Sequence, residues 1–410
     1  MAHRVLARIV ALLALLAGLL SGLTAPASAS AAPIKIALIT SITGLASPLF
    51  QHAPQGFLAR IALQNSMGGV NGHKLVPIVI NDETNPTQVA TAVQEAISDG
   101  VVGIVNDSSL FYAGYKYAQQ AGIPVTGGSF DGPEWGEQPN TNMFASDTGS
   151  VNPTYPASTL IGNFLKSHGG TVLGSYGISI SPSSIQSAKG AGISFERAGG
   201  KVGVLDTSVV YGSVDFTPES LVARSSGVNA VYAGMGNNQN FAIATTFKQA
   251  GVKLKAVVFP TGYEADIIHQ PVWSDVQGMY FSTQFRPTVL PNAGTVQMVA
   301  ALQRYQKRSP ANFPTFDVYE SWLGADLMIK GLQRAGANPT PANVIKSLRG
   351  IRSYNGNGLL PVSFDYATNF GHYDPQCSWF LRADANGFVP VSSAPLCGHD
   401  IPGTATAQGS

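Results

Sequence analysis

Two adjacent serines, Ser108 and Ser109, stand where an apolar run gives way to a helical pattern. The run Val101–Val105 predicts a buried strand, and Leu110–Gln120 has helical spacing. A serine at such a junction caps the helix, and a helix N-terminus is a ready site for an anion. The two serines are therefore candidates to hold a carboxylate or a similar group, with simple capping as the alternative.

Two other loops after predicted strands also carry candidate residues. Gly128, Ser129 and Phe130 follow the strand Ile123–Thr126, and the glycines there let the backbone approach a ligand. Phe130 could stack on that ligand or pack inside. After the strand Ala256–Phe259, Tyr263 and Glu264 follow in the same way. Glu264 is either a solvated surface carboxylate or a partner for a ligand ammonium.

Motifs of the common enzymes and metal sites are missing from the chain. It contains no G-x-S-x-G, no H-E-x-x-H and no P-loop. Gly234-Met235-Gly236 lacks the third glycine of a dinucleotide site, and His372-x-Asp374 is better explained as an ordinary loop than as a metal-ligand pair. We therefore expect no metal and no cofactor, although a Ser/His/Asp set is spatial and is not excluded by the absence of a motif.

The elements that must position these loops alternate along the chain. Strands are predicted at Ile34–Thr40, Leu75–Ile80, Val101–Val105, Ile123–Thr126, Thr171–Ser175, Lys201–Val210, Ala230–Ala233 and Ala256–Phe259. Helices are predicted at His52–Asn65, from Asn85 onward, and at Leu110–Gln120, Asn152–Lys166, Pro182–Ala198, Pro218–Ser226, Asn238–Ala250, Gly294–Lys307, Asp317–Ala335 and Pro341–Leu348. Such alternation predicts parallel sheets built from βαβ units, with the ligand crevice beyond the carboxyl ends of the strands. The pattern stops near Ala145–Val151 and restarts, which indicates two α/β sets.

Composition excludes several classes of protein. The chain has 410 residues, a net charge of +1 and a pI near 7.8, which argues against a nucleic-acid reader. Hydrophobic residues make up 44%, too many for a disordered chain. Two cysteines cannot build a disulfide-dense scaffold or a cysteine-rich zinc site.

The first 31 residues have the pattern of a secretory signal peptide. Arg4 and Arg8 precede an apolar core, Ile9–Leu20, and small residues up to Ala31 follow it. The core is too short to span a bilayer. We expect cleavage near Ala29–Ala31, no membrane anchor, and a periplasmic or secreted protein. Export makes a disulfide between Cys377 and Cys397 plausible.

Several stretches in this order resemble type I periplasmic substrate-binding proteins of ABC transporters, in the leucine/isoleucine/valine-binding branch. The resembling stretches are Ile34–Thr40 with Gly44, Met67–Leu75, Asn81–Pro86, Ala121–Thr126, Val214–Thr217 and Val228–Tyr232. The likeness extends from Ile34 to Phe388, nearly the whole mature chain.

The resemblance implies an α/β fold of two doubly wound parallel-sheet lobes joined by a three-segment hinge. Crossovers are expected near Ser146, Pro260 and Pro361. Lobe one would then comprise residues 34–146 and 261–361, and lobe two residues 147–260 and 362–400. Residues 401–410 would form a flexible tail.

The resemblance also implies roles for the candidate residues. One of Ser108 and Ser109, together with Gly128–Phe130, would hold a ligand α-carboxylate, Glu264 would meet an α-ammonium, and an aromatic ring at Phe50 would pack on the ligand. The full candidate set is Phe50, Ser108, Ser109, Gly128, Ser129, Phe130, Ser183, Ser184, Asn237, Tyr263, Glu264 and Tyr319. Ser183, Ser184 and Asn237 stand where the family pattern differs, so both a free amino acid and another carboxylate or amide stay open.

The function that the resemblance implies is capture of a small solute by lobe closure. The closed form, expected to be a monomer, would deliver the solute to an ABC permease driven by a cytoplasmic ATPase. A ligand sensor of the same fold is the main alternative. An extracellular enzyme using Glu264 and a structural wall protein are weaker ones.

Overall fold

The computed structural model describes residues 31–129, 132–136, 140–147, 156–371 and 377–405. Residues from Pro33 onward form one compact unit. Residues 1–30 lie outside the described part, so the expected signal peptide stays a prediction. No helix among the described residues is both long enough and apolar enough to cross a membrane.

The first sheet in the described chain has five strands in the order β2-β1-β3-β4-β5. Their bounds are β1 Ala31–Thr40, β2 His73–Asn81, β3 Gly103–Asp107, β4 Val125–Gly127 and β5 Met143–Ala145. The pairs β1–β3, β3–β4 and β4–β5 are parallel. The strands β3, β4 and β5 are buried throughout. For this reason their sequences do not alternate between apolar and polar residues.

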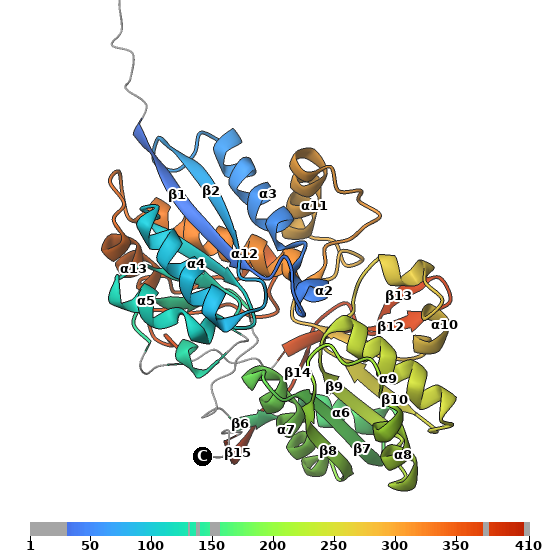
Figure 1. The fold of residues 1–410 in the computed structure, drawn as a ribbon. Coiled ribbons are helices and arrows are strands. Elements are labelled where there is room, and N and C mark those ends of the chain that lie inside the picture. Colours follow the sequence, from blue (N-terminus) through green and yellow to red (C-terminus); the bar gives the residue numbers. More distant parts are fainter. Residues whose placement is uncertain (1–30, 130–131, 137–139, 148–155, 372–376, 406–410) are drawn as a thin grey trace, which may run out of the picture. The chain divides into compact units, whose positions relative to one another are not determined.

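Helices cover both faces of this sheet (Figure 1). Their bounds are α2 Ser47–Phe50, α3 Ala53–Ser66, α4 Pro86–Ser98, η1 Phe111–Ala113, α5 Tyr115–Gln120, η2 Pro133–Trp135, α11 Ala293–Gln306, α12 Phe316–Arg334, α13 Pro341–Arg349 and η4 Gly356–Gly358. Helix α12 packs on α3, β3 and β4, whereas α4 packs with α5. Helix α4 begins as the sequence predicts, with the Asn85 side chain accepting a hydrogen bond from the Thr87 N–H and Pro86 in the first turn.

The second sheet of the described residues follows the order β13-β12-β11-β10-β9-β7-β8. Its strands are β7 Val172–Ile178, β8 Lys201–Val209, β9 Ala230–Gly234, β10 Ala256–Phe259, β11 Tyr280–Thr283, β12 Cys377–Asp384 and β13 Gly387–Pro390. The flanking elements are β6 Pro156–Ser158, α6 Leu160–Ser167, α7 Pro182–Arg197, α8 Thr217–Ser225, α9 Asn237–Gln249, η3 Asp266–His269, α10 Trp273–Val276, β14 Leu396–Cys397 and β15 Asp400–Ala405. From β8 to β11 the strands are parallel, and β12 and β13 continue the sheet antiparallel.

The two sheets share one winding pattern, which confirms the predicted doubly wound fold. In β2-β1-β3-β4-β5 and in β8-β7-β9-β10-β11, the second strand of each unit lies at the edge, and the third returns to the other side of the first. The order therefore reverses between β1 and β3 and between β7 and β9. In open α/β sheets, ligands bind at such reversal points, beyond the carboxyl ends of the strands.

Two of the expected crossovers lie elsewhere. The prediction placed the second near Pro260, but β11 pairs with β10, and Trp273 and Phe281 belong to the core of the second sheet. The chain joins the first core only at Phe285. Tyr366 is still part of that first core, so the third crossover follows it rather than lying near Pro361. Residues 261–283 thus belong with the second sheet and 362–366 with the first.

Three local predictions were also wrong. The predicted helix Asn152–Lys166 begins, in its described part, only at Leu160, because Pro156 lacks an N–H and sits in the short strand β6. The tail from residue 401 is not frayed at its start, since β15 pairs with β6. The predicted helix Leu110–Gln120 is split at Gly114, where a Cβ atom would lie 2.8 Å from Val93 of helix α4.

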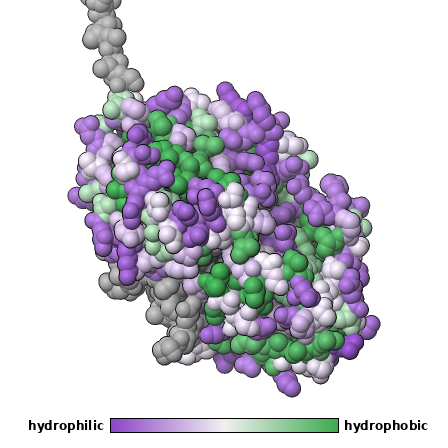
Figure 2. Space-filling view, viewed as in Figure 1, coloured by the Kyte–Doolittle hydropathy of each residue, from purple (hydrophilic) through white to green (hydrophobic). Residues whose placement is uncertain are grey.

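The disulfide expected from export is present and joins Cys377 of β12 to Cys397 of β14. Figure 2 shows hydrophobic residues in patches among hydrophilic ones on the visible face. This mixed surface fits a chain with only 11% charged residues.

Candidate functional site

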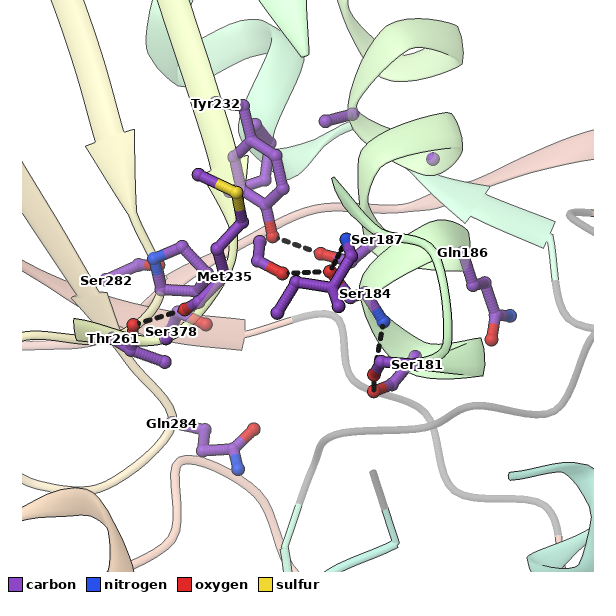
Figure 3. A pocket seen from close by; sticks show the side chains of 18 of the residues that line it. Ser181, Ser184, Gln186, Ser187, Tyr232, Met235, Thr261, Ser282, Gln284 and Ser378 are labelled. Carbon is purple, nitrogen blue, oxygen red and sulfur yellow. Dashed lines mark hydrogen bonds between the residues drawn. The ribbon is translucent and has the colours of Figure 1, made fainter. Parts of the chain in front are cut away.

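A cavity of about 340 Å³ lies at the carboxyl ends of the strands of the second sheet and reaches residues of the first (Figure 3). Leu49, Phe50, Ser109 and Phe316 come from the first sheet and its helices. The remaining wall is built largely from helix α7, the end of β9 and the segment 156–161. Residues of both α/β units therefore line one cavity, whose volume lies at the lower end of the range for drug-sized ligands.

The polar part of this wall consists of hydroxyl and amide groups. No Asp, Glu, Lys, Arg or His is found among the described residues that line the cavity. Its hydroxyl-bearing and amide-bearing residues are Ser109, Ser158, Ser181, Ser183, Ser184, Gln186, Ser187, Ser194, Tyr211, Tyr232, Thr261, Ser282, Thr283, Gln284 and Ser378. These groups can donate hydrogen bonds to a solute and accept them from it.

The N-terminus of α7 is fixed to the second sheet through serine hydroxyls (Figure 3). Ser181 caps the helix by accepting a hydrogen bond from the Ser184 N–H. The Ser184 hydroxyl accepts from the Ile178 N–H at 2.7 Å and donates to the Gly234 carbonyl. Ser187 and Tyr232 share a hydrogen bond of 2.5 Å between their hydroxyls. These bonds hold β7, α7 and β9 together and occupy the hydroxyls concerned.

Ser109 offers a buried hydroxyl to the cavity. It is only 8% exposed, and its interaction with the Tyr211 side chain lies within the cavity wall. The Tyr211 hydroxyl lies beside it from the other α/β unit. Burial raises the pKa of Tyr211 to about 12, the nearby Ser109 hydroxyl opposes the rise, and Asp82 adds to it. Tyr211 is therefore protonated at neutral pH, so the two groups form a pair of donors for an acceptor such as a carboxylate.

Four of the candidate residues line this cavity: Phe50, Ser109, Ser183 and Ser184. The first of them, Phe50, is 1% exposed and meets the Phe316 ring edge-on at 6.3 Å between centroids. Phe130 lies outside the described residues.

Three candidates lie at the edge of the first sheet without lining the cavity. The Ser108 hydroxyl accepts a hydrogen bond from the Leu110 N–H at 3.2 Å, so its capping role is local. The Gly128 carbonyl accepts from the Asn106 side chain at 3.0 Å. Ser129 donates its N–H and its hydroxyl to Asp147 at 3.1 and 2.8 Å.

The other four candidates lie on other surfaces or in the cores. Asn237 lines a smaller neighbouring cavity of about 270 Å³ and donates a hydrogen bond to Glu264. Tyr263 stacks on Phe313, with 4.5 Å between ring centroids. Tyr319 stacks on Phe285 at 5.0 Å and donates its hydroxyl to the Arg286 carbonyl.

Glu264 is not part of the cavity wall, and its surroundings favour the neutral carboxyl. Burial raises the pKa of Glu264 to about 8, Asp317 and Asp266 raise it further, and Arg308 acts in the opposite direction. The carboxyl is therefore largely protonated at pH 7. Glu264 therefore provides this cavity with no charged partner for a ligand ammonium.

Two buried acids, Asp147 and Glu320, meet at Gln284, where the second crossover reaches the first α/β unit. The Gln284 amide donates to Asp147 at 3.2 Å and to Glu320 at 2.9 Å. Burial raises the pKa of Asp147 to about 6, against hydrogen bonds from Ser129 that lower it. Burial, together with Asp147 and Asp107, raises the pKa of Glu320 well above its usual value. Gln284 also lines the cavity, so this network borders the site.

Several residues of the wall, among them Tyr211, Tyr232 and Gln284, were not predicted from the sequence. Tyr211 follows strand β8 directly, so the strand-end argument that found Ser109 would have found it too. Gln284 follows β11, a strand of four residues that carries no periodic signal. Tyr232 lies within β9, where a sequence cannot distinguish a cavity-facing ring from a core ring. The described residues hold no group of three or more His, Cys, Asp or Glu that could bind a metal ion.

Comparison with known proteins identifies relatives along nearly the whole chain. The profile of the periplasmic binding protein family matches residues 33–387. The Leu/Ile/Val-binding protein homolog 3 of Brucella melitensis is 24% identical over 363 residues, which cover 83% of this chain and 92% of that protein.

Solved structures share the fold at lower sequence identity. A branched-chain amino acid transporter substrate-binding protein of Streptococcus pneumoniae, in complex with isoleucine, superposes with a TM-score of 0.71 at 16% identity, covering 89% of this chain and 99% of that one. A solute-binding protein of R. palustris, in complex with benzoate, gives a TM-score of 0.72 at 16% identity, covering 91% and 99%.

Proposed function

The chain belongs to the periplasmic binding protein family, and we propose that it is the solute-binding component of an ABC importer whose solute is an organic acid that needs no ammonium group. The family consists of solute-binding proteins rather than enzymes, as the sequence analysis expected. Export with removal of residues 1–31 and delivery to a membrane permease are part of the same proposal.

The observation that carries this solute class is that the described part of the cavity wall has no charged side chain. Among the described lining residues, the polar groups are hydroxyls and amides, and Leu49, Phe50, Ile178, Met235 and Phe316 supply apolar surface. Buried Ser109 and protonated Tyr211 can both donate to a carboxylate, and hydrogen bonds to a charged acceptor are stronger than neutral ones. An α-ammonium would enter the same space without a carboxylate to pair with, and leaving a buried charge unpaired is costly.

Capture follows from the position of the donors. Ser109 belongs to the first α/β unit and Tyr211 to the second. A carboxylate that accepts from both hydroxyls binds the closed arrangement more tightly than an open one, and only such a difference shifts the population toward closure. The Asp147–Gln284–Glu320 network lies at the crossovers about which the two units would move.

The relatives support transport and allow more than one solute class. The Brucella relative is named for binding leucine, isoleucine and valine, whereas the R. palustris structure holds benzoate, an acid without an ammonium group. The uncharged wall of this cavity favours the second kind of solute.

A ligand panel followed by thermal unfolding tests the proposal. The panel contains free amino acids, their ammonium-free analogues, aromatic acids, dicarboxylates and short amides. We expect monocarboxylic acids to raise the unfolding temperature, since a ligand at 100 times its Kd adds about 2.7 kcal/mol to stability. Cells without this chain should also lose uptake of the best acid. Stabilisation by amino acids alone, or unchanged uptake, would contradict the proposal.

A further inference from the structure

The cavity extends well beyond the crevice, along helix α7. Seven residues of that helix line it, all on one face: Ser183, Ser184, Gln186, Ser187, Gly190, Ala191 and Ser194. At 1.5 Å of rise per residue, the eleven steps from Ser183 to Ser194 span about 16 Å. That length is far greater than a leucine-sized solute requires.

This space lies between small side chains on α7 and the segment 156–161, which faces them. Gly190 and Ala191 remove bulk from the middle of the helix face, while Pro156, Ala157, Leu160 and Ile161 form the opposite side. Helix α6 closes against α7 at the inner end. There the Gly162 N–H donates to the Ser194 hydroxyl at 2.8 Å, and a Cβ atom on Gly162 would lie 2.0 Å from the Ser194 carbonyl.

The hydroxyls along this inner part are already hydrogen-bonded within the protein. Ser187 is bonded to Tyr232, Ser194 to Gly162, and Ser158 to the Leu160 N–H. An apolar group placed against them does not have to break these hydrogen bonds, which lowers the cost of desolvating the hydroxyls. At the crevice end, by contrast, the buried Ser109 and Tyr211 hydroxyls lie next to each other in the cavity wall.

We propose that the space between α7 and residues 156–161 is a tail channel, which holds the extended, unbranched apolar tail of an acid whose carboxylate lies at Ser109 and Tyr211. This assignment rests on the proposed function and adds the shape of the solute to it. The channel length corresponds to roughly a dozen carbon–carbon bonds of about 1.5 Å in a zigzag chain.

A chain-length series measures the channel directly. Hexanoate, octanoate, decanoate and dodecanoate are titrated into the purified, extensively dialysed chain by calorimetry. We expect the affinity to rise by about fourfold per added methylene, because each buried methylene contributes about 0.8 kcal/mol. The rise should stop once the channel is full.

Two variants that fill the channel from opposite walls make the test specific. Gly190→Leu acts from α7, and Ile161→Phe acts from α6, where Ile161 is half-buried. Each should reduce the affinity for dodecanoate to nearly that for hexanoate. Gly192→Ala is the control for the change in helix propensity, because a Cβ atom there would have only an ordinary contact with Val202 at 3.5 Å.

The outcomes separate this inference from the function on which it rests. If hexanoate binds but affinity does not depend on chain length, or if neither filling variant affects dodecanoate, there is no tail channel and the proposed function stands. If no acid of any length binds the unaltered chain, the acid site fails, and the tail channel fails with it.

Discussion

Replacing Ser109 by alanine and Tyr211 by phenylalanine together should weaken the binding of an organic acid by about two to four orders of magnitude. Each hydroxyl is expected to donate one hydrogen bond to the carboxylate, and a hydrogen bond to a charged group contributes about 1.5–3 kcal/mol. Both substitutions keep the shape of the wall. Titration calorimetry with the best acid of the panel gives the affinities of the two single variants and of the double variant.

Ser108→Ala is the matched control for this pair. Its hydroxyl is fully buried and accepts from Leu110, but it does not line the cavity. The control should therefore lose some stability and keep its affinity for the acid. An unchanged affinity in the double variant, or an equal loss in the Ser108 control, would show that Ser109 and Tyr211 do not hold the carboxylate.

Glu264→Gln should make the protein more stable at pH 8 by roughly 4 kcal/mol and at pH 5 by less than about 1 kcal/mol. The folded-state pKa of Glu264 is raised from 4.5 to about 8, first by burial and then by Asp317 and Asp266. Between these values the native state binds more protons than the unfolded state. The stability contributed by the neutral carboxyl is therefore present at low pH and lost as the pH rises through 8. Glutamine keeps the neutral form at every pH and still accepts a hydrogen bond from Asn237.

Denaturant unfolding of both proteins at pH 5 and pH 8 checks this expectation. The acids Asp147 and Glu320 also have raised pKa values, but they are common to the two proteins and cancel in the comparison. Glu95→Gln, at an exposed position of α4, should change the stability at neither pH. Equal pH dependence in the parent and in Glu264→Gln would mean that Glu264 is ionised in the native state.

Most strands and helices could be predicted because local patterns of apolar residues mark their positions in the sequence. The strand Ala256–Phe259 and the helix from Pro182 were placed correctly, since buried parallel strands are short apolar runs between helices. Strand β11 was missed because its four residues show no periodicity. That one omission moved the second crossover from Gln284 to Pro260.

The site could be predicted only in part, because strand ends show where a loop begins but not where it goes. Ser109 follows strand β3 and lines the cavity, and Ser184, in the first turn of α7, lines it as well. Glu264 also follows a strand, yet the neighbouring Tyr263 packs on Phe313 and the loop leaves the crevice. The depth of the cavity along α7 depends on how closely α6 approaches that helix, which is a tertiary contact with no local signature.

The central claim is that hydroxyls hold a carboxylate in a cavity whose described wall carries no charged side chain, and that no ammonium takes part. It is tested most directly by calorimetric titration of leucine and 4-methylpentanoate, which differ only in the α-ammonium group. The account predicts that 4-methylpentanoate binds at least about tenfold more tightly, because burial of an unpaired ammonium opposes the binding of leucine. Tighter binding of leucine would contradict it.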